Sequence, residues 1–413
     1  MKHLQVVRAV LCLLLLSGFA AGETDRILLP ATVGEIPGPT PGRRDGILRN
    51  EAARVIDQLI LTYGETDFSP LVAYLQGSTD ASPNDVVPFF SLGHAHLNRF
   101  ERGKGPDDFL RALVLFETPV RGDIWPAWGN RWATSITLSH LMKGLLRLRR
   151  LSPDDAALES RIAVLWDRVA QLAADEADRK LTDETPYLPY VSVTTGDTKA
   201  EENAWEAVFL AWASVLYPDH PRAAAWEEKG RLLASLSVVR ESDAAFFEGM
   251  QIATVHEDFT LENHALAPNP YYAVATVMLL RMGALAYRMT GHTVPDEFDR
   301  NVRGLYGRYR TYCSLDESGR WVWNLASDPV GDPALWPLPG LDETGFVHSL
   351  VAQKVREEAL WLPTPRVETL VPDEGKGLKP DAVLGRAIQN AKVVWYYLDG
   401  AYLWLEPAPS GPD

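Results

Sequence analysis

"TKAEENAWEAVFLAWASVLYP", residues 198–218, is apolar around almost the whole circumference of the helix that it predicts. Such a helix must be buried against other helices, because water would otherwise surround its apolar surface. Residues 273–280 share this character, whereas residues 154–180 predict a helix with a broad charged face. We therefore expect an inner layer of buried helices that is backed by an outer layer of half-exposed helices.

Helical periodicity continues along most of the chain and predicts about eleven or twelve helices of ordinary length. They include residues 46–64, 270–289, 343–362 and 384–405. Another covers residues 152–181, where Ser152 is the predicted cap and Pro153 lies in the first turn. Residues 248–255 and 319–323 are the candidates for short hairpin strands. The predicted fold class is all-α: an (α/α)n toroid or barrel of antiparallel helix pairs, with minor short β-hairpin pieces. An α-solenoid is the structural alternative, but the sequence contains no repeat of fixed period.

The two ends of the chain differ in composition from its middle. Residues 1–22 predict a secretory signal peptide, because a basic start precedes an apolar run and small residues. Residues 23–44 are rich in Pro and Gly and predict an extended leader, and residues 406–413 predict a frayed tail. We expect residues 45–405 to form a single α/α-barrel domain, and the mature protein to be secreted or periplasmic.

The composition excludes several classes of function. Loss of Lys2 and Arg8 with the signal peptide lowers Lys+Arg from 40 to 38 against 55 acidic residues, which gives a net charge of −17. Such a chain is not a general nucleic-acid or anionic-membrane binder. Cys313 is then the single cysteine, so no internal disulfide is expected.

Tryptophan is frequent, with 13 residues in the chain. An exposed indole can stack on a sugar ring because it combines an apolar face with a polar edge. For any single tryptophan a place in the core is the simpler interpretation, but as a group they indicate a carbohydrate-binding surface. Six fall outside apolar periodic runs: Trp125, Trp128, Trp132, Trp321, Trp323 and Trp336.

Residues 256–272, "HEDFTLENHALAPNPYY", crowd histidines and acids just before an apolar helix. His264 has no apolar period around it, so its imidazole is a candidate base or hydrogen-bond donor. A metal held by His256, Asp258, Glu262 and His264 is the alternative, but the spacing matches no metal motif. We therefore expect neither a metal nor another cofactor.

Two further stretches hold candidate polar residues. Asn203 follows Glu201 and Glu202 in the first turns of a helix too apolar to lie in water, so it is expected to point inward or into a cleft. The alternative is that the two acids only complement the helix dipole. Residues 299–314, "DRNVRGLYGRYRTYCS", are either an outer face with arginine stems over tyrosine rings or a site in which guanidinium groups bind carboxylates.

Four ordered blocks carry a family resemblance: "GDTKAEENAW", "DFTLENHALAPNPYY", the Arg/Tyr helix and "PLPGLDETGFVHS". They resemble the α/α-barrel polysaccharide lyases, most of all the alginate and glucuronan lyases of polysaccharide lyase family 38. The resemblance covers roughly residues 190–350. Ala265 and Ala267 depart from the family pattern, which has a Gly and a bulkier residue there.

The resemblance implies β-elimination on a uronic-acid polysaccharide such as alginate, polymannuronate or glucuronan, so that the partner would be an anionic polysaccharide. Donors around the uronate carboxylate would stabilise developing charge, and a tyrosine would transfer the proton. The implied catalytic residues are Asn203, His264, Arg303 and Tyr309, with Tyr306 and Tyr312 as alternatives to Tyr309. The implied substrate-binding residues are Glu202, Asn263, Tyr272, Tyr306, Trp128, Trp323 and His348.

Two alternatives of other classes stay open, as does the oligomeric state. The first is an α/α-toroid glycoside hydrolase, which needs two carboxyl groups about 5–10 Å apart. Asp258 or Glu262 could be paired with Asp342 or Glu343 for that purpose. The second is a non-catalytic exported glycan-binding protein that uses the tryptophans.

Overall fold

The protein is described from a computed structural model. The structure describes residues 68–79, 81–101, 103, 107–182, 198–243, 246–247, 250–262, 270–315, 321–323, 370–373 and 377–380. The predicted signal peptide, leader and tail lie outside these ranges, as do the helices expected at 46–64, 343–362 and 384–405. The single domain expected over residues 45–405 therefore stays a prediction.

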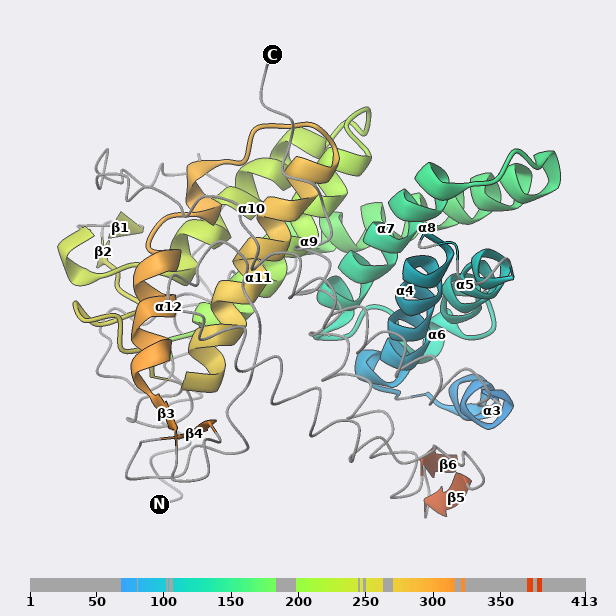
Figure 1. The fold of residues 1–413 in the computed structure, drawn as a ribbon, viewed down its shortest axis with the longest axis horizontal. Coiled ribbons are helices and arrows are strands. Elements are labelled where there is room, and N and C mark those ends of the chain that lie inside the picture. Colours follow the sequence, from blue (N-terminus) through green and yellow to red (C-terminus); the bar gives the residue numbers. More distant parts are fainter. Residues whose placement is uncertain are drawn as a thin grey trace.

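Helices dominate the described part of the chain (Figure 1). The α-helices are α3 (Ser69–Gly77), α4 (Val87–Glu101), α5 (Asp108–Glu117), α6 (Trp125–Trp128), α7 (Thr134–Leu151), α8 (Ala156–Thr182), α9 (Ala200–Leu216), α10 (Ala223–Ser237), α11 (Pro270–Met289) and α12 (Val302–Thr311). Short 3-10 turns are η1 (Pro83–Val86), η2 (Thr118–Val120), η4 (Glu241–Asp243) and η5 (Asp296–Phe298).

Strands form three antiparallel two-stranded hairpins in the described residues. They pair β1 (Phe246–Phe247) with β2 (Met250–Gln251), β3 (Cys313–Leu315) with β4 (Trp321–Trp323), and β5 (Leu370–Asp373) with β6 (Gly377–Pro380). The first two overlap the predicted hairpin pieces, and the third was not predicted. The predicted fold class, all-α with antiparallel helix pairs and minor hairpins, is confirmed.

Helix α9 is the buried centre of the described part, as its apolar circumference predicts. It packs against α10, α11, α7 and α8, and nearly all of its residues are buried. Gly230 of α10 faces α9, where a Cβ atom would lie 3.1 Å from the Cβ atom of Leu210. The missing side chain therefore allows the two helices to lie close together. Figure 1 shows α9, α10 and α11 side by side, with α12 beside α11.

Helices α4, α5 and α7 interlock around one aromatic side chain. Phe116 of α5 points its ring at Gly93 of α4 and Gly144 of α7, where added Cβ atoms would lie 2.9 and 2.6 Å from the ring. Phe116 is completely buried. Burying a side chain of this size contributes about 1.5–3 kcal/mol, so the two glycines act together to admit it.

Helix boundaries follow the predictions closely in two places and differ in a third. Helix α11 begins and ends at the predicted residues, and α9 begins two residues later than its stretch. The start of α8 was predicted with Ser152 as the cap and Pro153 in the first turn. Instead, Asp155 is the cap, because its Oδ1 accepts the N–H groups of Ala157 and Leu158 at 2.9 and 3.1 Å.

Helix length and hydropathy give one more result. Among the helices that the structure describes, none combines the length and the apolar character that crossing a bilayer requires.

Candidate functional site

Polar side chains gather where the start of α9 meets the segment formed by residues 252–262. The contact is made by Thr198, whose Oγ1 donates to the backbone oxygen of Glu262 at 3.2 Å. Thr198 comes one turn before Glu202 on α9, so this hydrogen bond brings the two glutamate-bearing segments together. The site therefore combines one helix N-terminus with one irregular segment.

Glu202 has one oxygen bound and one without a partner among the described residues. Lys199 Nζ lies 3.2 Å from Glu202 Oε1 in an ion pair, and the Glu202 side chain is only 7% exposed. Its Oε2 is buried and has no hydrogen-bond partner there. A buried polar atom in this condition calls for an explanation, and hydrogen bonding to a ligand or water is the ordinary one.

Glu262 repeats this arrangement with a different base. His256 Nε2 lies 3.0 Å from Glu262 Oε1, and the Glu262 side chain is 12% exposed. Glu262 Oε2 is likewise buried without a hydrogen-bond partner in the described part of the chain. The two carboxyl groups thus share one pattern: one oxygen is held by a basic side chain and the other has hydrogen-bonding capacity left.

Asn203 lies beside Glu202 and is completely buried. Neither its Nδ2 nor its Oδ1 has a hydrogen-bond partner among the described residues. Burying an amide without hydrogen bonds costs about 1–3 kcal/mol. This confirms that Asn203 points inward, as its surroundings in the sequence predict, and its role stays a prediction.

The backbone is unusual on both sides of the carboxyl pair. Phe259 has φ 63° and Lys199 has φ 59°, which is left-handed for residues that carry a Cβ atom. The turn around Phe259 is closed by two hydrogen bonds of 2.9 Å, from Phe259 N to His256 O and from His256 N to Thr260 O. Strained conformations of this kind gather at functional sites, because neighbouring structure must hold them.

Asp258 faces α12 instead of the carboxyl pair. Its Oδ2 lies 3.0 Å from Arg308 Nη2. Partial desolvation acts in the opposite direction, but hydrogen bonds from Thr260 and the Arg308 charge hold the pKa of Asp258 below its ordinary value. Arg308 also donates through Nε to Thr260 Oγ1 at 3.1 Å and to Tyr312 Oη at 3.0 Å. These contacts make Asp258 an anchor for the turn.

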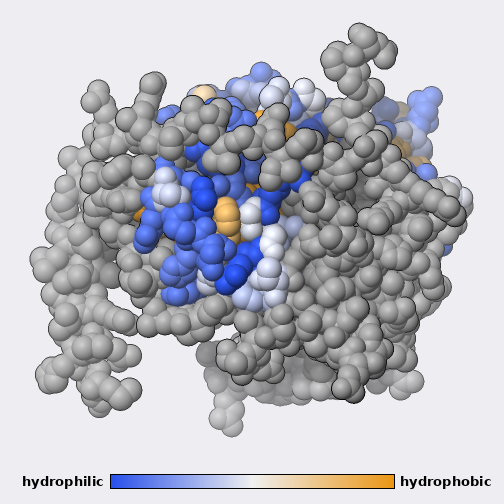
Figure 2. Space-filling view, turned by 60° about the vertical axis from the view of Figure 1, so that its left-hand side comes forward, coloured by the Kyte–Doolittle hydropathy of each residue, from blue (hydrophilic) through white to orange (hydrophobic). Residues whose placement is uncertain are grey.

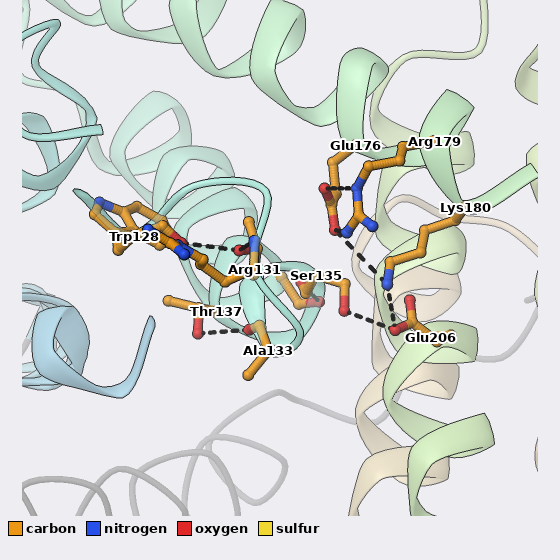
Figure 3. A network of polar contacts seen from close by, with 11 residues as sticks. Trp128, Arg131, Ala133, Ser135, Thr137, Glu176, Arg179, Lys180 and Glu206 are labelled. Carbon is orange, nitrogen blue, oxygen red and sulfur yellow. Dashed lines mark hydrogen bonds and ion pairs between the residues drawn. The ribbon is translucent and has the colours of Figure 1, made fainter. Parts of the chain in front are cut away.

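Helix α9 is held in place one turn beyond the site by a buried ionic network (Figure 3). Glu206 Oε1 accepts from Lys180 Nζ of α8 at 2.7 Å and from Ser135 Oγ of α7 at 3.2 Å. Glu176 Oε1 in turn lies 2.7 Å from Arg179 Nη2. Because Glu206 and Glu202 are four residues apart, they share one face of α9, and the network fixes the orientation of that face.

The Arg/Tyr helix is α12, in which Arg303 differs in exposure from two of the tyrosines. Arg303 is exposed, whereas Tyr306 and Tyr309 are 2% and 0% exposed. The two tyrosine rings stack with their centroids 6.0 Å apart. This agrees with the interpretation of α12 as an outer face over a tyrosine core, and the structure does not bring Arg303 to the same side as Tyr309.

Other predicted site residues lie in the core or outside the described ranges. Trp128 is completely buried, and its Nε1 donates to Pro119 O at 2.8 Å, so it is a core residue. Tyr272 is partly buried at the start of α11, and Trp323 pairs with Cys313 in a hairpin. Outside the described residues lie His264, Asn263, His348, Asp342 and Glu343.

Two contributors to the site were missed or placed in another role. Lys199 received no role, although its spacing of three residues from Glu202 is the spacing of a helical ion pair. Glu202 was expected only to bind substrate, and nothing in the sequence showed that the residues just before its helix contact the backbone of Glu262, 60 residues further on. That contact is the Thr198 hydrogen bond, which local periodicity does not predict.

No cluster of three or more His, Cys, Asp or Glu side chains that could hold a metal ion occurs within the described ranges. The expectation that no metal is bound stays a prediction, because His264 lies outside those ranges.

Comparison with known proteins gives distant structural matches. No protein-family model matches the chain, and no curated protein matches it. Two solved structures of an α-1,6-mannanase, GH76A of Salegentibacter sp. HEL1_6, do match. Both are inactive variants, one in complex with α-1,6-mannotriose and the other with α-1,6-mannotetrose. Each has 12% identity and a TM-score of 0.38, and they cover 86% and 87% of this chain and 99% of their own.

The matched structures are glycoside hydrolases, which contradicts the prediction of a polysaccharide lyase. The resemblance to polysaccharide lyase family 38 is therefore corrected, together with the alginate or glucuronan substrate and the β-elimination that it implied. The catalytic roles of Asn203, His264, Arg303 and Tyr309 were implied by that resemblance alone, and no observation on the described residues tests them. The resemblance rested on short blocks, and short polar blocks at helix starts are shared by unrelated sites.

Proposed function

We propose that the protein is a glycoside hydrolase in which Glu202 and Glu262 form the pair of catalytic carboxyl groups. The observation that carries the proposal is the shared pattern of these two side chains. Each has one oxygen held by a basic group, Lys199 or His256, and one buried oxygen without a partner among the described residues. Two carboxyl groups are the chemical requirement of most glycoside hydrolases.

Hydrolysis needs two different roles from the two carboxyl groups. We assign Glu202, which is paired with the ammonium group of Lys199, as the nucleophile or as the base that activates water. Glu262 then takes the other role, as the general acid that protonates the departing glycosidic oxygen. Neither role requires a metal or an organic cofactor.

The exposure of Asp258 and the hydrogen bonds of the turn before Glu262 favour this assignment. The alternative was a pairing of Asp258 or Glu262 with Asp342 or Glu343. Asp258 is 57% exposed and is engaged by Arg308, which leaves it poorly placed for proton transfer. The turn that carries Glu262 is fixed by its hydrogen bonds and by the Phe259 backbone. A catalytic carboxyl group needs such a fixed support, because misplacement by about 1 Å can cost 10²-fold in rate.

A direct test measures the release of reducing ends from a panel of polysaccharides by the full chain. Glu202→Gln and Glu262→Gln should each lower kcat by about 10²- to 10⁴-fold, as expected for loss of a general acid or base. Glu228→Gln, at an exposed position of α10, is the matched control and should keep full activity. Unchanged turnover in either site variant would refute the assignment of that residue.

The stereochemistry of the product gives a second measurement. Carboxyl groups about 5–5.5 Å apart retain the anomeric configuration, and groups about 6.5–9.5 Å apart invert it. Proton NMR of the first product shows which mechanism operates. If no polysaccharide releases reducing ends but some are bound, the protein is a glycan-binding protein without catalysis.

A further inference from the structure

Trp132 is an exposed indole next to the candidate site. The described residues include four large apolar side chains that are exposed: Leu110, Val114, Trp132 and Val164. Three of these lie on the outer faces of α5 and α8, where a single apolar residue needs no explanation. Trp132 differs because it is aromatic, 55% exposed, and located in the loop before α7.

The indole of Trp132 packs against a second indole, that of Trp205. Its ring centroid lies 4.6 Å from that of Trp205, with the planes inclined at 59°. Trp205 belongs to α9, is 7% exposed, and lies three residues after Glu202 on the same helix face. Trp205, which contacts the exposed Trp132 ring, thus lies about one helical turn, roughly 5 Å along the axis, from Glu202 on α9.

The loop that carries Trp132 is held by several hydrogen bonds. Asn130 has φ 57°, a left-handed conformation that asparagine tolerates better than most residues. Arg131 N donates to Thr134 Oγ1 at 2.8 Å, and Thr134 Oγ1 donates to Trp128 O at 3.0 Å. The Arg131 guanidinium donates to the backbone oxygen of Thr79. These hydrogen bonds order the loop before a ligand binds, so less conformational entropy of the protein is lost on binding.

We propose that Trp132 forms a sugar-binding subsite in which its indole stacks on the face of an uncharged pyranose unit of the glycan chain. This inference rests on the proposed function, because the subsite adjoins the Glu202 and Glu262 pair. A pyranose ring presents a face of C–H groups that fits an indole, while its hydroxyl groups reach polar neighbours.

The negative charge of nearby glutamates favours binding of an uncharged sugar ring over a uronate. Glu201 and Glu202 lie within about one turn of Trp205 on α9, and the backbone of Glu262 contacts the start of that helix. The whole chain carries a net charge of −15. Lys199 is already paired with Glu202, and Arg131 is directed to Thr79. Figure 2 brings the α12 side of the molecule forward, and the described surface there is mostly hydrophilic. A carboxylate on the sugar would meet net repulsion beside the glutamates.

The experiment measures binding and turnover separately with the full chain. Affinity electrophoresis in gels containing α-1,6-mannan, xylan, β-glucan or alginate identifies polymers that bind, and calorimetry with oligosaccharides of the best polymer gives Kd. Trp132→Ala should weaken binding of an uncharged glycan about tenfold, which corresponds to about 1.4 kcal/mol. Trp132→Phe should stay within about threefold of wild type because a ring is kept, and Val164→Ala should not change binding.

Each outcome decides the inference. It is overturned if Trp132→Ala binds as tightly as wild type, if no uncharged glycan in the panel is bound, or if alginate is bound in preference. It is supported if KM rises with the Kd while kcat of Trp132→Ala stays within about twofold. Binding that depends on Trp132 in a protein that hydrolyses nothing would uphold the subsite and refute only the proposed hydrolase.

Discussion

At the scale of single residues, the site depends on a contact between Phe259 and Gly304, neither of which has a reactive side chain. Phe259 holds its left-handed backbone in the turn between His256 and Glu262. Its ring lies against Gly304 of α12 on one side, and the guanidinium of Arg240 lies 5.0 Å from the ring centroid. The position of the turn that carries Glu262 is therefore set by the absence of a side chain at residue 304.

A matched pair of glycine substitutions in α12 tests this. A Cβ atom at Gly304 would lie 2.2 Å from the Phe259 ring, whereas at Gly307 nothing lies within 4 Å. Gly304→Ala should lower the free energy of unfolding by about 1–3 kcal/mol through overpacking, and it should reduce activity because the turn shifts. Gly307→Ala should instead raise the free energy of unfolding by about 0.5–1 kcal/mol, because alanine lowers the conformational entropy of the unfolded chain.

Urea denaturation of both variants gives the two free energies, and reducing-end release gives activity. Equal effects of the two substitutions would show that the Phe259 contact does not position the turn.

At the scale of elements, the buried ion pair between α8 and α9 fixes the helix that presents Glu202. Lys180 and Glu206 are 2% and 5% exposed. Lys180→Met should lower the free energy of unfolding by about 3–5 kcal/mol, because a buried carboxylate then loses its partner. Arg231→Ala breaks a more exposed pair with Glu297 and should cost less than about 1 kcal/mol. Thermal or urea unfolding compares the two, and similar losses would contradict a structural role for the buried pair.

The elements were largely predictable from sequence, and their meeting points were not. Apolar periodicity predicted α11 at both ends, and the all-round apolar character of 198–218 predicted that α9 is buried. The cap of α8 was misplaced because Ser152, Asp154 and Asp155 all suit a helix start, and only the backbone geometry selects Asp155.

The candidate site was predicted in part for the same reason. Polar crowding before α11 drew attention to Glu262 and His256, which are hydrogen-bonded to each other. The partner of Glu262 was sought in Asp342 or Glu343, because sequence spacing does not show which distant helix end lies nearby. The arginines of α12 suggested chemistry, although their tyrosines are packed inward.

At the scale of the whole molecule, the α4–α7 contact should make stability depend on pH. His94 and His140 are buried on facing helices, and His94 Nε2 lies 3.0 Å from His140 O. Burial lowers the pKa of both imidazoles well below the ordinary value, and the neighbouring Lys143 charge acts in the same direction. Burial also lowers the pKa of Lys143 itself, and the Arg147 charge adds to the effect.

The direction of the pH effect follows from proton uptake. Below about pH 6.5 the unfolded chain protonates these histidines while the folded protein does not, so unfolding takes up protons and acid favours it. The contribution of the two histidines is fully present above about pH 6.5 and is lost as the pH falls, by up to about 1.4 kcal/mol per pH unit for each histidine. Urea unfolding between pH 5.5 and 7.5, roughly the range in which histidine titrates, measures the slope.

A variant that cannot titrate separates this contact from the rest of the molecule. His94→Gln should flatten the dependence of the unfolding free energy on pH, whatever its effect on stability at pH 7. If His94→Gln keeps the wild-type slope, His94 is not a source of the acid sensitivity.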